Sequence, residues 1–261
     1  DGSNGFRLDG IDAGDISGSS VSSAGDVNGD GFDDILIGAR RADPGGNSEA
    51  GENYVVFGKA SGFTASLSLS TLDGSNGFRL DGLDAGDISG RSVSSAGDVN
   101  GDGFDDILFS GYFSENSAGT QAGETYLVFG KASGFDASFD FTTLDGINGT
   151  RFDGFVQGSQ SGRSVSSAGD INGDGFDDIL IGAYFGNTID PIGSQRTGET
   201  YVVFGKASGF GANVDLASLE GTTGFRIVGI DGADYSGRSV SSAGDINGDG
   251  FDDILIGSAG G

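Results

Sequence analysis

Short apolar segments alternate with turn-forming segments along this chain, and the whole pattern recurs. In the first repeat, apolar runs occupy residues 34–39 and 52–58, a segment of small residues precedes them at 20–25, and residues 77–82 follow. Segments of this length, bounded by Gly, Asn and Asp, are typical of β-strands. The pattern therefore predicts four strands in each repeat and an all-β fold.

The apolar runs at residues 34–39 and 52–58 do not alternate cleanly between apolar and polar positions, which indicates strands that are buried on both faces. The small residues at 20–25 suit a crowded place, such as strands that converge on an axis. Repeated four-stranded units with both faces covered favour a β-propeller-type array of four-stranded antiparallel blades. A β-solenoid would have a shorter period.

The repeat divides the chain into units 1–72, 73–144, 145–219 and 220–261, of which the last lacks its second half. The sequence starts at Asp1 and contains no Met. We therefore expect one repeat domain that is a segment of a longer array, in preference to a self-contained ring of four blades.

A loop with the sequence D-x-N-x-D-G-F-D-D separates the first two predicted strands of every unit. Oxygen-bearing side chains at alternate positions of a tight loop can converge on a hard cation, and Ca²⁺ takes roughly six to eight oxygen ligands. Gly31 stands where the loop must turn, so a positive φ is expected there. In the first copy the candidate ligands are the side chains of Asp26, Asn28, Asp30 and Asp34 and the main-chain carbonyl of Phe32.

The other three copies keep every ligand position, which predicts about four bound Ca²⁺ ions, one per unit. Three carboxylates and one amide favour Ca²⁺ over Mg²⁺, which retains more of its own water. An EF-hand would need an acid at the twelfth loop position, where Ile37 stands; turns that bind nothing are the alternative. The equivalent positions are Asp98, Asn100, Asp102, Phe104 and Asp106; Asp170, Asn172, Asp174, Phe176 and Asp178; and Asp245, Asn247, Asp249, Phe251 and Asp253.

The 261-residue chain carries 39 acidic and 13 basic residues, a formal net charge of −26. Such a charge disfavours nucleic acid and anionic membrane surfaces as partners. No apolar stretch approaches the roughly 20 residues of a membrane helix, so no membrane insertion is expected.

The sequence contains neither Cys nor His and shows no nucleophile–base pair, so we expect no enzyme activity. The acid pair Asp33-Asp34 could suggest a glycosidase, which needs two carboxyl groups on either side of a scissile bond. In our interpretation Asp34 is a metal ligand and Asp33 faces solvent. The D-x-S-x-S stretch that ends at Ser19 has Arg91 at the corresponding position of the next unit, which argues against a second metal motif.

The order of Ser17-Gly18, the acidic loop, I-L-I-G-A and then Y-V-V-F resembles the FG-GAP repeat. That repeat forms the propeller of integrin α-subunits and occurs in many large secreted bacterial surface proteins. The resemblance spans essentially the whole chain and implies calcium loops at the positions named above. Ser17-Gly18 in place of the "FG" pair puts in doubt any ligand function borrowed from animal receptors.

We therefore expect a calcium-stabilised extracellular interaction or adhesion module of a bacterial surface or matrix protein. Its partner would be an extracellular protein or glycan, or copies of itself in an assembly. A structural filament or surface-layer element and a lectin-like glycan-binding propeller remain alternatives. The segments 40–51, 112–123 and 184–198 differ between units, and they are either binding loops or spacers.

Overall fold

The computed structural model describes residues 2, 4–132, 134–186 and 196–260. This part of the chain consists of β-strands and short 3₁₀ helices, and it contains no helix long and apolar enough to cross a membrane. The all-β prediction is confirmed. The four 3₁₀ helices are η1 (Pro44–Gly46), η2 (Leu69–Thr71), η3 (Phe141–Thr143) and η4 (Leu216–Ser218).

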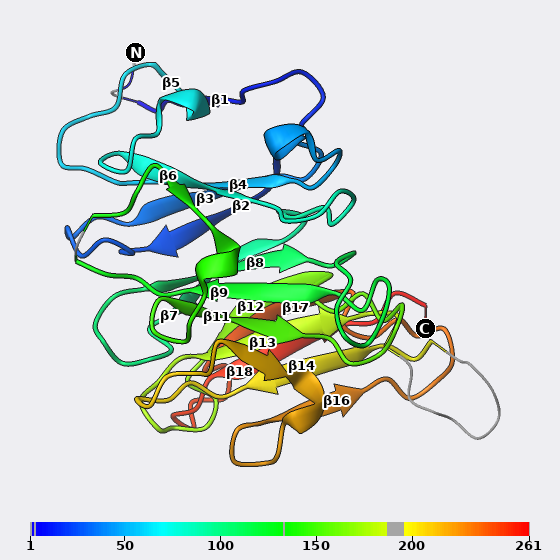
Figure 1. Cartoon of the computed structure of the whole chain (residues 1–261). Helices are drawn as coiled ribbons and strands as arrows, with labels where there is room; N and C mark the ends of the chain where they lie inside the picture. The colour runs from blue at the N-terminus through cyan, green and yellow to red at the C-terminus, as the bar shows by residue number, and fades with distance from the viewer. Residues whose placement is uncertain (1, 3, 133, 187–195, 261) are drawn as a thin grey trace.

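The first large sheet contains the strands predicted at residues 20–25, 34–39, 52–58 and 77–82 in antiparallel order (Figure 1). From the inside outward they are β2 (Ser17–Gly25), β3 (Asp34–Ala39), β4 (Glu52–Val56) and β6 (Gly77–Asp81). A fifth strand, β10 (Ser138–Phe139), comes from the second unit and pairs with β6 in parallel.

The second large sheet repeats this arrangement. Its antiparallel strands are β7 (Val93–Gly97), β8 (Asp106–Gly111), β9 (Glu124–Val128) and β11 (Gly149–Asp153). A short strand of the third unit, β15 (Asn213–Asp215), pairs with β11 in parallel.

The third sheet has four antiparallel strands: β12 (Ser164–Gly169), β13 (Asp178–Ala183), β14 (Glu199–Val203) and β16 (Gly224–Val228). Two smaller sheets complete the described structure. They are the hairpin of β17 (Ser239–Gly244) with β18 (Asp253–Gly257), and the parallel pair of β1 (Arg7–Asp9) with β5 (Ser66–Ser68).

The third sheet has four strands, whereas the first two sheets have a fifth, parallel strand that the prediction did not include. The alternating stretches before η2, η3 and η4 form short strands, each of which pairs in parallel with the strand near the start of its own unit. The pairing joins segments about 60 residues apart, as in Ser138 with Arg79. No local sequence pattern can indicate such a contact.

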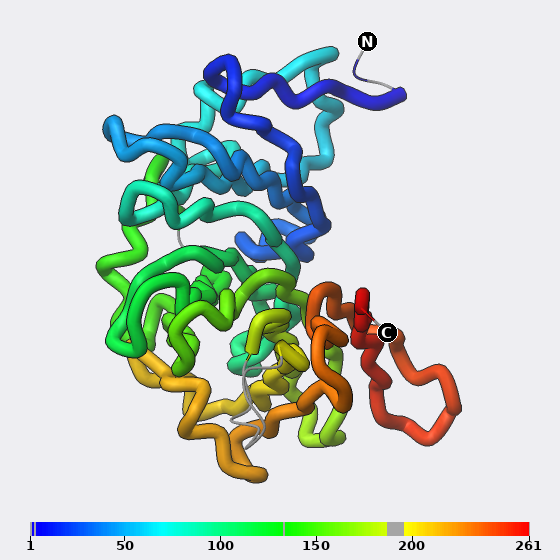
Figure 2. The backbone as a smooth tube through the Cα atoms, turned by 90° about the vertical axis from the view of Figure 1, so that its right-hand side faces the viewer, coloured from blue at the N-terminus to red at the C-terminus, as the bar shows by residue number. Residues whose placement is uncertain are grey.

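The innermost strands β2, β7, β12 and β17 lie next to one another in that order, so the sheets are stacked face to face (Figures 1 and 2). Small side chains permit this close approach, as expected. The hydroxyl of Ser20 accepts a hydrogen bond from Val93 N–H at 3.1 Å, and Ser92 does the same for Val165 N–H.

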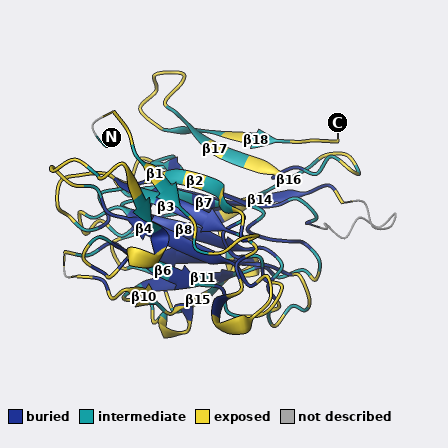
Figure 3. Cartoon of the chain, turned by 90° about the horizontal axis from the view of Figure 1, so that it is seen from above, coloured by how far each residue is buried: buried dark blue, intermediate teal, exposed yellow. Residues whose placement is uncertain are grey.

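Both faces of the middle strands are buried, as predicted (Figure 3). On β8, Ile107 and Phe109 join the core shared with the first sheet, and Leu108 joins the core shared with the third sheet. The apolar runs lack alternation because each side chain has a neighbouring sheet to pack against.

The hairpin loops of successive units also contact one another. A carboxylate oxygen of Asp105 accepts a hydrogen bond from Asp26 N–H at 2.7 Å, and Asp105 N–H donates to the carbonyl oxygen of Asp26 at 3.3 Å. The ring of Phe104 lies against Gly29, where a Cβ atom would be 2.3 Å from a ring carbon. Asp177 and Phe176 repeat these contacts with the second loop, and Asp252 and Phe251 with the third.

This finding corrects the expectation that the first acid of each Asp-Asp pair faces solvent. Asp33 is indeed exposed, but Asp105, Asp177 and Asp252 are partly covered by the preceding loop. The reason is again a contact between units, since the acceptor meets an amide about 80 residues away in the chain.

Removal of the Asp177 carboxylate should destabilise the fold more than removal of its counterpart in the first loop. Asp177→Ala leaves Asp98 N–H without its acceptor, and we expect a loss of about 1–2 kcal/mol in the free energy of unfolding. Asp33→Ala is the matched control, and its change should stay within about 0.5 kcal/mol because Asp33 is exposed. Urea unfolding in calcium-containing buffer measures both, and equal losses would contradict the inter-loop contact.

Candidate metal centres

The four candidate sites lie in the hairpin loops that join β2 to β3, β7 to β8, β12 to β13 and β17 to β18. In each hairpin the strand register shifts just before the loop, as between Ser23 and Gly25. The expected positive φ at Gly31 is confirmed, with a value of 87°.

Three of the predicted ligands of the first loop lie close together. Asp26 Oδ1 and Asn28 Oδ1 both accept a hydrogen bond from Asp30 N–H, at 3.0 and 2.9 Å, and Asp26 Oδ2 accepts from Gly31 N–H at 2.8 Å. Asp30 Oδ1 in turn accepts from Phe32 N–H at 3.0 Å. The loop is thus wrapped around the carboxylate of its first residue.

The same hydrogen bonds recur in the other three loops, with distances that agree within a few tenths of an ångström. In the second loop, for example, Asp102 N–H donates to Asp98 Oδ1 at 3.0 Å and to Asn100 Oδ1 at 2.8 Å. The equivalent groups are Asp170, Asn172 and Asp174 in the third loop and Asp245, Asn247 and Asp249 in the fourth.

The last predicted side-chain ligand, Asp34, ties the loop to the sheet. Its Oδ2 accepts from Val27 N–H at 3.1 Å, and its Oδ1 accepts from Gly58 N–H, just beyond β4, at 2.8 Å. Asp106 and Asp178 make both equivalent contacts, whereas Asp253 has the contact within its loop, to Ile246 N–H at 3.0 Å.

These carboxyl groups are strongly perturbed. Burial raises the pKa of Asp34 to about 7, that of Asp106 to about 8 and that of Asp178 to about 7. The neighbouring loop carboxylates add a smaller increase, Asp30 and Asp26 in the case of Asp34. In the absence of an ion, ionisation of these carboxyl groups is therefore unfavourable. A bound cation would lower the free energy of the ionised form.

Phe32 and its equivalents have a role that the sequence did not suggest. Their main-chain carbonyls stay predicted ligands, while the rings of Phe104, Phe176 and Phe251 pack on the preceding loop. The sequence did contain a signal of this contact between loops. An aromatic residue and a second acid recur at fixed positions in every loop, and calcium binding needs neither of these side chains.

The chemistry of the loops fits a calcium ion, although the groups do not stand around a common point. A carboxylate oxygen that accepts one main-chain N–H keeps a lone pair for a cation. In the described part of the chain, however, no three acidic side chains form a ready coordination set.

A second set of buried acids recurs on the third strands and is explained by packing. Glu124 accepts a hydrogen bond from the Tyr126 hydroxyl at 2.5 Å and lies 3.4 Å from the Arg151 guanidinium. Burial raises the pKa of Glu124 to about 7. Glu52 and Glu199 have the same partners in their own units, so these groups join neighbouring strands and do not face a ligand.

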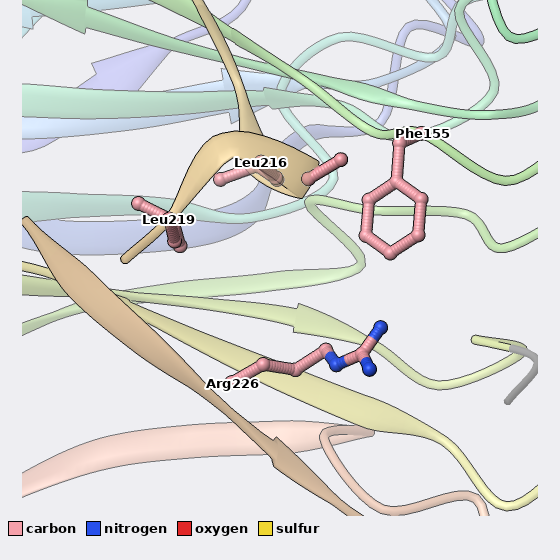
Figure 4. A pocket seen from close by; sticks show the side chains of 5 residues that line it. Phe155, Leu216, Leu219 and Arg226 are labelled. Carbon is pink, nitrogen blue, oxygen red and sulfur yellow. The ribbon is translucent and has the colours of Figure 1, made fainter. Parts of the chain in front are cut away.

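A cleft of about 380 Å³ lies beside β16, between η4 and the segment that follows β11 (Figure 4). The Arg226 guanidinium lies 5.6 Å from the centre of the Phe155 ring and forms an ion pair with Glu199 at 3.5 Å. Because the Arg226 guanidinium is already paired with Glu199, the lining of this cleft gives no reason to propose a ligand site there.

Comparison with known proteins agrees with this geometry. The FG-GAP repeat family matches the chain four times, at residues 17–56, 89–128, 161–203 and 236–261, which together make up more than half of it. Each matched segment contains one acidic hairpin loop.

A distant relative is integrin alpha pat-2 of Caenorhabditis elegans, which is 33% identical over 103 residues. The aligned region is 39% of this chain and only 8% of the integrin, so the chain spans a small part of that relative. The four matches across the repeats show that this chain belongs to the FG-GAP repeat family.

Proposed function

We propose that this chain is a calcium-stabilised interaction or adhesion module that acts outside the cell, on a bacterial surface or in a matrix. The observation that carries the proposal is the identical wrapping of four FG-GAP loops around an aspartate carboxylate. The family points to a non-enzymatic, adhesion-type domain. Millimolar external calcium is sufficient even for weak extracellular sites.

In this proposal each large sheet is one blade of a propeller-type array, and one Ca²⁺ ion fixes the hairpin between its two inner strands. The side chains of Asp26, Asn28, Asp30 and Asp34 would hold the ion in the first blade. The ion would replace carboxylate repulsion with attraction at each loop, and its binding energy would add to the folding energy.

The binding surface would lie at the opposite ends of the sheets, where the variable loops begin. These loops are attached to the next unit, as in the hydrogen bonds from Ile88 N–H to the Glu49 carbonyl at 3.1 Å and from Gln160 N–H to the Gln121 carbonyl at 3.0 Å. The second loop lines a cleft of about 670 Å³ with Asp87 and Glu115. In the third loop, 184–198, residues 187–195 lie outside the described structure.

A chelator should lower the melting temperature. Each site contributes about 2.7 kcal/mol when free calcium exceeds its Kd a hundredfold. Four sites in a chain of this size then correspond to a fall on the order of 10 °C or more. Differential scanning calorimetry with and without EDTA measures the shift, and an unchanged melting temperature at saturating chelator would refute structural calcium.

Loss of one ligand should remove one ion. Asp174→Asn takes a carboxylate from the third loop, and we expect about three bound calcium ions per chain in place of about four. Asp33→Asn removes the same charge from an exposed side chain outside the ligand set and should leave the stoichiometry unchanged. Elemental analysis after equilibrium dialysis counts the ions, and equal counts for the two variants would contradict the assignment.

The calcium-dependent stabilisation should increase with pH. Asp34, Asp106 and Asp178 have raised pKa values in the folded, ion-free chain, so the stability of this form falls as the pH rises through about 7 to 8. Calcium needs the ionised groups and must displace protons at lower pH. The calcium-induced rise in melting temperature should thus be larger at about pH 8 than at about pH 5.5, with affinity about tenfold weaker in acid.

A structural role by end-to-end assembly is the second candidate, and two exposed surfaces favour it. Phe32 and Asp33 on the first hairpin and Ile246 on the last are exposed, although their equivalents Phe104, Asp105 and Val99 are covered by neighbouring units. Each surface is half of the contact that joins units within the chain. Another FG-GAP unit, of the same polypeptide or of a second copy, would complete it.

Sedimentation over a range of protein concentrations tests end-to-end association of the chain. We expect assemblies that Phe32→Ala weakens and that Phe63→Ala, at a partly exposed ring elsewhere in the first unit, leaves intact. A concentration-independent monomer would count against self-assembly, and a glycan array separates the lectin-like alternative.

A further inference from the structure

The arginines of this chain fall into two groups. Five form ion pairs with acidic side chains, namely Arg7, Arg41, Arg79, Arg151 and Arg226. In the part of the chain that the structure covers, the other five, Arg40, Arg91, Arg163, Arg196 and Arg238, form no such pair, although acids outnumber bases three to one in the sequence. An arginine without a counter-charge in so acidic a chain needs an explanation.

Three of these arginines, Arg40, Arg91 and Arg163, lie near Tyr112, and Arg163 also lies near Tyr184. The guanidinium carbon of Arg163 lies 5.5 Å from the centre of the Tyr112 ring and 5.4 Å from that of Tyr184, so Arg163 stands between the two rings. Arg91 also lies beside Tyr112. Burial and the nearby charges of Arg163 and Arg40 lower the pKa of Arg91.

The repeat places these residues at one edge of the stack. Arg91 precedes β7 and Arg163 precedes β12, while Arg40, Tyr112 and Tyr184 directly follow β3, β8 and β13 (Figure 1). The residues therefore come from two positions of the repeat, one just before the innermost strand and one just after the second strand, where the variable loop begins. We call these five residues the arginine–tyrosine row.

The row has an electrostatic cost that the fold does not compensate. Its arginines are partly buried and Tyr112 is buried, so the positive charges are only partly hydrated. The charges of Arg163 and Arg40 disfavour the charged state of Arg91, and contact with a tyrosine offsets only part of that cost. An oxyanion between the arginines would supply the missing counter-charge. The planar guanidinium groups suit it, because they bind carboxylate and sulfate oxygens in pairs.

We propose that the arginine–tyrosine row binds the carboxylate or sulfate group of an acidic sugar. The net charge of −26 opposes a ligand with many adjacent charges, such as an acidic peptide, and favours an isolated acidic group on a neutral body. Tyrosines beside the arginines offer hydroxyl groups and apolar ring edges, which suit a sugar ring. The inference deepens the proposed interaction function and rests on it.

Titration of the calcium-loaded chain with simple sugars tests this assignment. The probes are methyl glucuronide, which carries a carboxylate, and glucose 6-sulfate, with neutral methyl glucoside as their control. We expect at least one acidic probe to bind about tenfold more tightly than the neutral one in isothermal titration calorimetry. The two acidic probes distinguish a carboxylate from a sulfate ligand.

Adjacent arginines provide a matched pair of variants. Arg40→Gln and Arg91→Gln should each weaken acidic-sugar binding about tenfold. Arg41→Gln removes an exposed arginine that already pairs with Glu49, and it should leave binding unchanged. Melting temperatures of all variants establish that they fold.

Three outcomes would overturn the proposal. Equal binding of acidic and neutral sugars, or equal effects of Arg91→Gln and Arg41→Gln, would exclude the row as the recognition element. Tighter binding of an oligoglutamate peptide would assign the row to acidic peptides. If no anion binds, the row is only a contact between sheets. None of these outcomes would change the effect of calcium on the melting temperature. The sugar-binding proposal and the calcium-stabilised function can therefore be refuted independently.

Discussion

The whole arrangement depends on carboxylates that accept hydrogen bonds from main-chain amides. Asp26 and its equivalents hold the shape of each hairpin loop, and Asp34, Asp106 and Asp178 fasten their loops to the residues that follow the third strand of each sheet. Asp105, Asp177 and Asp252 then carry the contact to the preceding loop. One type of interaction thus acts within loops, between loop and sheet, and between units.

This use of carboxylates has an electrostatic consequence. Every loop concentrates negative charge, and the raised pKa of Asp106 shows that burial and neighbouring acids oppose ionisation there. A bound calcium ion would convert that repulsion into attraction. At the other end of the sheets the charges are mixed, because Arg91 and Arg163 lie near Tyr112 while Asp87 and Glu115 line a cleft.

Binding and assembly place different demands on this fold. Nearly identical loops, packed by Phe104 and its equivalents, make each unit a good template for the next. The segments after β3, β8 and β13 differ from unit to unit. Their side chains can therefore vary while the repeated core stays the same. A rigid repeated core with variable edges is the division of labour expected of an interaction scaffold.

The sequence by itself determined the strands, the repeat and the loop chemistry, because all three are local. Apolar runs such as residues 34–39 and the spacing of Asp26, Asn28 and Asp30 need only neighbouring residues to be interpreted. The parallel strand β10 beside β6, the Asp105 contact with Asp26 and the stacking of Arg163 between Tyr112 and Tyr184 were decided by tertiary structure alone. Each joins residues about 20 to 80 positions apart in the sequence, and only the folded arrangement of the strands and sheets brings them within reach of one another.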